Sequence, residues 1–164
     1  MEKDFTGLLE TMEKQSDVYE RLLSLANEKQ PVLVKGNIPE LEKITKAEEI
    51  LILQIGRLEE KRQVLHRSLA SHFALSPGDL TVSELETLAG EEMAAKLKLL
   101  CEKMVGTLQK LETINRSNSY LIEKSLDYLD FSLNVITSDN TASSYNGKEE
   151  KEKDKPSKIF DRKV

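Results

Sequence analysis

Few residues in this chain have side chains that commonly catalyse reactions or bind metals. The 164 residues include two histidines and one cysteine. His66 and His72 lie six positions apart, whereas two metal ligands on one helix face are spaced by four positions. Neither histidine ends a Glu-x-x-His pair, the arrangement that holds metal ions in helical bundles. We therefore predict no metal centre and no other cofactor.

The other reactive side chains have simple structural explanations. A single cysteine cannot form a disulfide within the chain, and we expect Cys101 to act as a small buried apolar residue. Glu48 and Arg62 fall among apolar residues, where we expect each of them to be paired or to extend toward water. The sequence has no glycine-rich phosphate loop and no serine nucleophile turn. It therefore predicts that the protein is not an enzyme.

Acidic and basic residues are interleaved along the chain, which has a formal net charge of −5. This pattern gives no basic stripe for the phosphates of a duplex, so nucleic acid is not an expected partner. No apolar run approaches the roughly 20 residues of a membrane span. The start, Met1-Glu2-Lys3-Asp4, lacks the basic and apolar regions of a signal peptide. We expect a cytoplasmic protein in a reducing compartment, without membrane insertion.

Helices must position any site in this chain, because 7 Gly and 4 Pro provide few turns. From Asp4 to Lys35, apolar residues recur in steps of three and four, which predicts a helix. Pro31 interrupts this pattern. The helix either ends near Lys29 or bends and continues to Gly36, and we favour the second interpretation.

Two further long helices are expected. Asn37 can cap a helix whose first turn contains Pro39 and whose apolar seam covers residues 41–72. A capping-box spacing at residues 81–84 then predicts a short helix before Gly90. The last helix has a seam that begins at Leu97, and we expect it to end near Thr137.

Three amphipathic helices of similar length with short connections predict an all-α fold. We expect an elongated, coiled-coil-like, antiparallel bundle of three long helices, with a short helix in the second connection. This helical domain should cover residues 1–137. Residues 138–164 are expected to form a flexible charged tail, because their few apolar side chains cannot offset the entropy lost on ordering.

In two regions, Ile50–Leu53 and Tyr120–Ile136, apolar residues exceed what one seam can bury. They either meet a neighbouring helix or a dimer mate, or they accept an amphipathic helix from a partner. Asn115 and Asn118 lie three positions apart in or beside the buried seam. Each amide therefore needs hydrogen-bond partners, and the pair either fixes the helix register or holds the backbone of a partner.

Six segments of the chain have a recognisable combination of residues. They are Leu33–Leu41, Ala47–Leu51, Leu58–Arg62, the spacing Asn115-x-x-Asn118-x-x-Leu121-Ile122, the pair Tyr145-x-Gly147 and the terminal Asp161-Arg162-Lys163. Together they resemble the FlgN family of cytoplasmic flagellar export chaperones. The resemblance covers nearly the whole chain, with departures at Pro31 and in the charged linker after Gly147.

This resemblance implies a type III flagellar export chaperone. Such a protein binds the amphipathic C-terminal helices of hook-associated (hook-filament junction) proteins, prevents their premature assembly and delivers them to the flagellar export apparatus. The residues expected to bind partners are Asn115, Asn118, Leu121, Ile122, Leu126, Leu129, Leu133, Ile136, Tyr145 and Phe160. A homodimer is possible when no cargo is bound. The alternative is a structural coiled-coil adaptor or tether that acts through homodimerisation.

Overall fold

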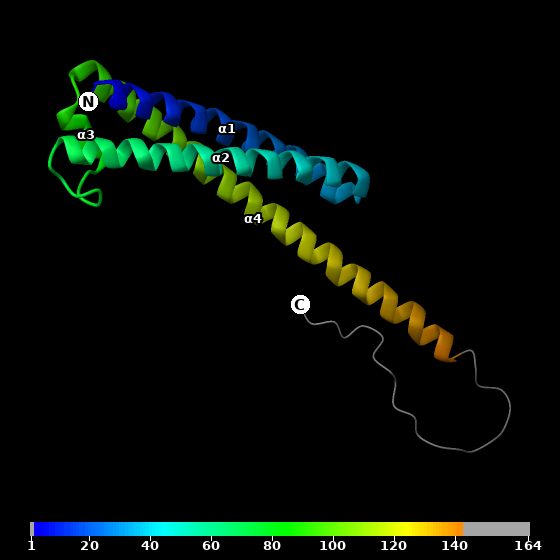
Figure 1. Ribbon diagram of the computed structural model, residues 1–164. Helices are drawn as coiled ribbons and strands as arrows, with labels where there is room; N and C mark the ends of the chain where they lie inside the picture. Colours follow the sequence, from blue (N-terminus) through cyan, green and yellow to red (C-terminus); the bar gives the residue numbers. More distant parts are fainter. Residues whose placement is uncertain (1, 143–164) are drawn as a thin grey trace, which may run out of the picture. The chain divides into compact units, whose positions relative to one another are not determined.

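The computed structural model describes residues 2–142, and these residues are almost entirely helical (Figure 1). Within them, α1 (Glu2–Lys35), α2 (Ile38–His72), α3 (Val82–Leu88) and α4 (Glu91–Ala142) follow one another. No strand occurs among these described residues. The prediction of an all-α fold is therefore confirmed.

The chain divides into two units, Met1–Ser125 and Leu126–Val164. The first unit holds α1, α2, α3 and the part of α4 that ends at Ser125. The second unit begins with Leu126 in the same helix. The domain boundary after residue 137 stays a prediction.

α1 continues through Pro31 to Lys35, so its predicted continuation past the proline is confirmed. Gly36 ends the helix with a positive φ of 62°, a conformation that glycine adopts without strain. The N–H of Asn37 then donates to the carbonyl of Val32 at 3.2 Å. This bond is typical of a Schellman motif, which satisfies a carbonyl left without a partner at the helix C-terminus.

Side-chain caps start the next two helices where the sequence predicts them. The side-chain oxygen of Asn37 accepts a hydrogen bond from the N–H of Glu40 at 3.3 Å, and Pro39 lies in the first turn of α2. At α3, the hydroxyl of Thr81 accepts from the N–H of Glu84 at 3.3 Å. The Glu84 carboxylate accepts from the N–H of Thr81 at 2.7 Å, which completes the capping box.

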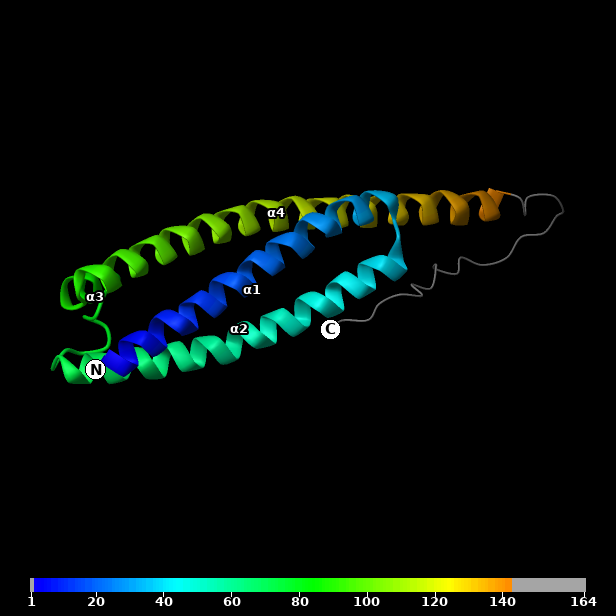
Figure 2. The same cartoon turned by 90° about the horizontal axis from the view of Figure 1, so that it is seen from above.

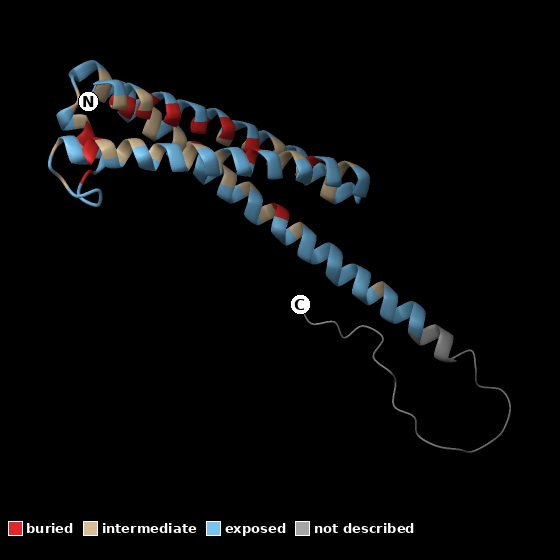
Figure 3. Ribbon diagram, in the orientation of Figure 1, coloured by how far each residue is buried: buried red, intermediate tan, exposed pale blue. Residues whose placement is uncertain are grey.

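In the first unit, α1 and α2 are in contact along their lengths and run in opposite directions (Figures 1 and 2). The main core lies where the start of α1 and the end of α2 meet α3 and the start of α4 (Figure 3). Leu8, Leu69 and Leu97 are its largest fully buried side chains. The whole cluster consists of Phe5, Leu8, Leu9, Met12, Leu69, Ala70, Leu80, Leu85 and Leu97.

The apolar core becomes thinner toward the turn at Gly36. A smaller cluster of Val18, Leu22 and Leu51 joins α1 to α2 there. α4 is held to α1 in the same unit by an ion pair between Lys103 Nζ and Glu20 Oε1, 2.9 Å apart. Polar contacts therefore supplement apolar packing in this part of the first unit.

α4 runs to Ala142, so the predicted helix end near Thr137 is wrong. The hydroxyl of Thr137 donates to the carbonyls of Leu133 and Asn134 at 2.9 and 3.2 Å, a local bond that is compatible with a continuing helix. The rest of the predicted tail, residues 143–164 with Tyr145 and Phe160, lies outside the described residues. Within residues 2–142, no helix is long and apolar enough to cross a membrane.

Candidate partner-binding site

The histidines and the cysteine contribute to packing between helices. His66 Nε2 lies 2.7 Å from the carbonyl oxygen of Leu80, and His72 Nε2 lies 3.2 Å from Asp4 Oδ2. Cys101 packs against the main core and is half-buried, and this burial raises the pKa of its thiol. The part of the chain that the structure describes contains no group of three side chains placed to hold a metal ion.

The charged residues of the seam are paired, as predicted. Arg62 donates from Nε and Nη2 to the two carboxylate oxygens of Glu59, at 2.8 and 2.7 Å. The amide of Gln15 in α1 donates to the same carboxylate at 3.1 Å. The hydrogen bonds from Arg62 lower the pKa of Glu59 to about 2. Glu48 pairs with Lys29 of α1, so this seam charge joins α1 to α2 directly, whereas Arg62 pairs within α2.

In the second unit, α4 exposes most of its apolar side chains, and this part of the helix is pale blue in Figure 3. Four of them follow a 3-4-3 spacing, which places them along one helix face. We call Leu126, Leu129, Leu133 and Ile136 the apolar stripe, and each is between 55 and 61% exposed. A continuous exposed apolar surface of this kind is typical of a protein-binding site.

The predicted site residues of the first unit differ in exposure. Leu121 is half-buried, whereas Ile122 is exposed. Asn118 is buried, and its Nδ2 donates to the carbonyl of Ala26 at 2.7 Å. Its Oδ1 is also buried and has no hydrogen-bond partner among the described residues. The bond to Ala26 fixes α4 against α1, which matches the first of the two predicted roles, that of fixing the helix register.

Asn115 lies beside the buried seam, as expected, but it is exposed and does not share the burial of Asn118. Its position three residues before Asn118 places it at the edge of the packed face, where water can satisfy its amide. Whether it binds a partner stays a prediction.

A hollow of about 420 Å³ lies between α1, α2 and α4 of the first unit. The contributions of α1 and α2 to this hollow could not be predicted from the spacing of residues in the sequence. The charge at Glu48 within an apolar seam was a signal that a partner such as Lys29 must lie nearby. The lining residues are Leu22, Lys29, Glu48, Ile52, Leu111, Asn115, Asn118, Ser119 and Ile122.

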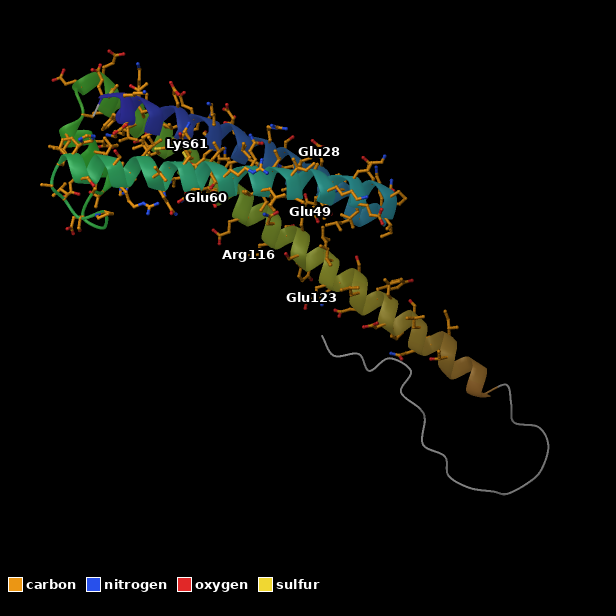
Figure 4. All side chains as sticks on the ribbon, in the orientation of Figure 1. Glu28, Glu49, Glu60, Lys61, Arg116 and Glu123 are labelled. Carbon is orange, nitrogen blue, oxygen red and sulfur yellow. The ribbon has the colours of Figure 1, made fainter. Side chains whose placement is uncertain are left out.

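The predicted region Ile50–Leu53 is also exposed, except for Leu51, which is buried against α1. Ile50, Ile52 and Leu53 on α2 are between 59 and 67% exposed. Charged side chains such as Glu28 and Arg116 surround the helices and are exposed (Figure 4). The described residues therefore present apolar segments within a largely charged surface.

An all-helical chain with an exposed apolar helix face, and without a cluster of reactive groups in its described part, is typical of proteins that act by binding other helices. The chain belongs to the FlgN family, because the model of that family, described as FlgN protein, matches residues 1–153. No curated protein and no solved structure matches the chain. The family consists of flagellar export chaperones and is not a family of enzymes, so the general function is that of a flagellar export chaperone.

Proposed function

We propose that the protein binds the amphipathic C-terminal helices of hook-associated proteins, prevents their premature assembly and delivers them to the flagellar export apparatus. The observation that carries this proposal is the apolar stripe of the second unit, whose residues are all more than half exposed. A cargo helix with apolar residues at the same spacing would cover these four side chains.

The size of the stripe suits reversible binding. Complete burial of a Leu or Ile side chain contributes about 1.5–3 kcal/mol. Because the four side chains are a little more than half exposed, covering them contributes roughly 3.5–7 kcal/mol. The lost freedom of both partners offsets part of this gain. A chaperone must release its cargo, so a moderate affinity is an advantage.

The remaining predicted residues have supporting roles in this proposal. The three long helices of an antiparallel bundle form the scaffold in the cytoplasm. In the first unit, Asn115, Leu121 and Ile122 add contacts to the cargo, and the buried Asn118 supports them by holding α4 against α1. Tyr145 and Phe160 contact the cargo or the export apparatus.

The test is to replace Leu126 and Leu133 together by Lys. The two charges should abolish binding of a synthetic C-terminal helix of a hook-associated protein, measured by calorimetry, and should leave the far-UV circular dichroism unchanged. The matched control replaces Leu99 and Val105 by Lys, because these residues of α4 are 68 and 54% exposed but belong to the first unit, outside the stripe. Binding by the stripe variant at the level of the control would refute the proposal.

A tether that acts through homodimerisation is the second candidate, because a second copy of the chain could also cover the exposed apolar side chains of α4. Sedimentation equilibrium at micromolar concentration separates the two. A tether should form a dimer whether or not cargo is present. A chaperone should form a stable heterodimer with the cargo helix when that helix is added.

A further inference from the structure

One exposed face of α2 collects basic residues that are interleaved with acidic residues in the sequence. A helix turns by about 100° per residue, so positions three and four apart share a face. We call this set the α2 face. Its own members include four basic residues and no acidic residue, and Glu42, Glu49 and Glu60, each three or four positions from a member, border it on one side. Its members are Lys43, Lys46, Ile50, Leu53, Gln54, Arg57, Lys61 and Val64, all of which are exposed.

Most of these positive charges are not neutralised within the described residues. Lys43 forms an ion pair with Glu40 at 2.9 Å on the surface of α2. Lys46, Arg57 and Lys61 form no ion pair within residues 2–142. Such side chains are available to pair with the carboxylates of a partner.

The acidic residues of this part of α2 lie along one edge of the face. Figure 4 labels Glu49 and Glu60 on one side of the helix and Lys61 on the other. On the side of α1, a hollow of about 330 Å³ borders Ile50, and the charged residue of its lining is Arg21. The charge of this hollow therefore has the same sign as that of the α2 face.

Apolar side chains lie between the positive charges. Ile50, Leu53 and Val64 are between 58 and 67% exposed. The hollow beside Ile50 has room for an apolar side chain from outside, since Leu25, Ala47 and Leu51 also line it. An occupant must therefore supply apolar groups together with negative charge.

We propose that the α2 face binds an acidic amphipathic helix of a partner protein. The face extends over residues 43–64, a length of about 33 Å at 1.5 Å per residue, which a helix of about 22 residues would match. Apolar residues of the partner cover Ile50 and Leu53, and its carboxylates pair with Lys46 and Arg57. The face is confined to one side of a single helix, which favours a helix as its occupant over a lipid surface.

A synthetic three-heptad helix with Leu at positions a and d and Glu at positions e and g is the probe, added to the full chain. It should bind more weakly as salt is added, and the amide shifts that it causes in NMR spectra of the labelled chain should lie in residues 43–64. Replacing Lys46 and Arg57 together by Glu should weaken binding about tenfold, because two favourable pairs become repulsive.

The matched control replaces Lys98 and Lys110 of α4 by Glu, which changes the net charge by the same amount and should leave binding unchanged. An equal loss of affinity for the probe in the variant of Lys46 and Arg57 and in the control would overturn the inference, since net charge alone would then explain both losses. Equal binding of a probe with Lys in place of Glu would also overturn it. So would binding to vesicles of equal parts phosphatidylcholine and phosphatidylserine without binding to the acidic helix.

This inference does not depend on the cargo proposal, because it concerns another helix. The variant with Lys at positions 126 and 133 should bind the acidic probe as the unmodified chain does. The variant with Glu at positions 46 and 57 should still bind the cargo helix. The two proposals can therefore fail separately.

Discussion

Replacing Glu59 by Gln removes the carboxylate on which Arg62, Gln63 and Gln15 converge. The pKa of Glu59 falls from its ordinary value of 4.5 to about 2, chiefly through the hydrogen bonds from Arg62. This difference would correspond to roughly 3.4 kcal/mol at about 1.36 kcal/mol per pKa unit. The side chains of Glu59 and Arg62 are each 36% exposed, so solvent screening reduces the expected loss of stability to about 1–1.5 kcal/mol.

The sign of the pH dependence follows from the lowered pKa. Ionised Glu59 stabilises the fold at pH values above the unfolded-state pKa of about 4.5, and this contribution is lost as the pH falls toward 2. Glu59→Gln should therefore be less stable than the unmodified chain at neutral pH, and the difference should shrink below pH 4.5. Urea unfolding followed by circular dichroism at several pH values measures this difference.

Glu112→Gln is the matched control, because Glu112 and Arg116 form a pair at 2.9 Å whose side chains are 69 and 80% exposed. Loss of this ion pair should lower the free energy of unfolding by less than about 0.5 kcal/mol. The reasoning would be refuted if the two variants had equal stability at neutral pH. A cost of Glu59→Gln that stayed constant as the pH fell would refute it as well.

Gly36→Ala should destabilise the fold by about 1 kcal/mol, because Gly36 has a positive φ. Gly56→Ala should stabilise the fold by about 0.5–1 kcal/mol, because the added Cβ meets no atom within 4 Å beyond the local helix backbone. Urea unfolding measures both changes. Thr81→Ala removes the cap of α3 and should cost about 1 kcal/mol, with faster amide exchange in that helix. Asn118→Asp should lower the stability of the fold by about 2–3 kcal/mol at neutral pH, because a carboxylate would face the carbonyl of Ala26. The loss of stability should be smaller in acid, where the protonated carboxyl group can donate a hydrogen bond to that carbonyl. Thermal unfolding at several pH values would show this difference.

Local signals in the sequence predict the helix starts and one helix end. Gly36, Asn37 and Thr81 act through hydrogen bonds within about one helical turn, so the neighbouring residues contain the necessary information. The end of α4 could not be predicted in this way. Thr137 bonds to its own preceding turn, and a helix with such residues can continue.

The contacts of the candidate site depend on how separate helices align. Asn118 bonds to Ala26, which lies 92 positions earlier in the chain. The pairing of Lys29 with Glu48 depends on the turn at Gly36, which sets α1 against α2. The sequence places Asn118 and Glu48 in a seam, but the partner of each follows only from the packed structure.

The α2 face shows why interleaved charges did not reveal a charged surface. In the sequence, Lys46 is followed by Glu48 and Glu49, and Arg57 by Glu59 and Glu60. On the helix, Glu48 and Glu59 turn away from the two basic residues and are used in contacts with α1, whereas Glu49 and Glu60 lie along one edge of the α2 face. A pattern that looks neutral along the chain can therefore become positive on one side of a helix.

The main core also has a consequence for how the protein folds during synthesis. Leu8 of α1 and Leu97 of α4 are both almost completely buried in it. At about 5–20 residues per second, a ribosome adds Leu97 roughly 5–20 s after Leu8. Until then the apolar face of α1 has only part of its final covering, so the nascent chain presents an aggregation-prone surface for several seconds. The start of α4, which is synthesised after α1, α2 and α3, therefore completes the covering of α1.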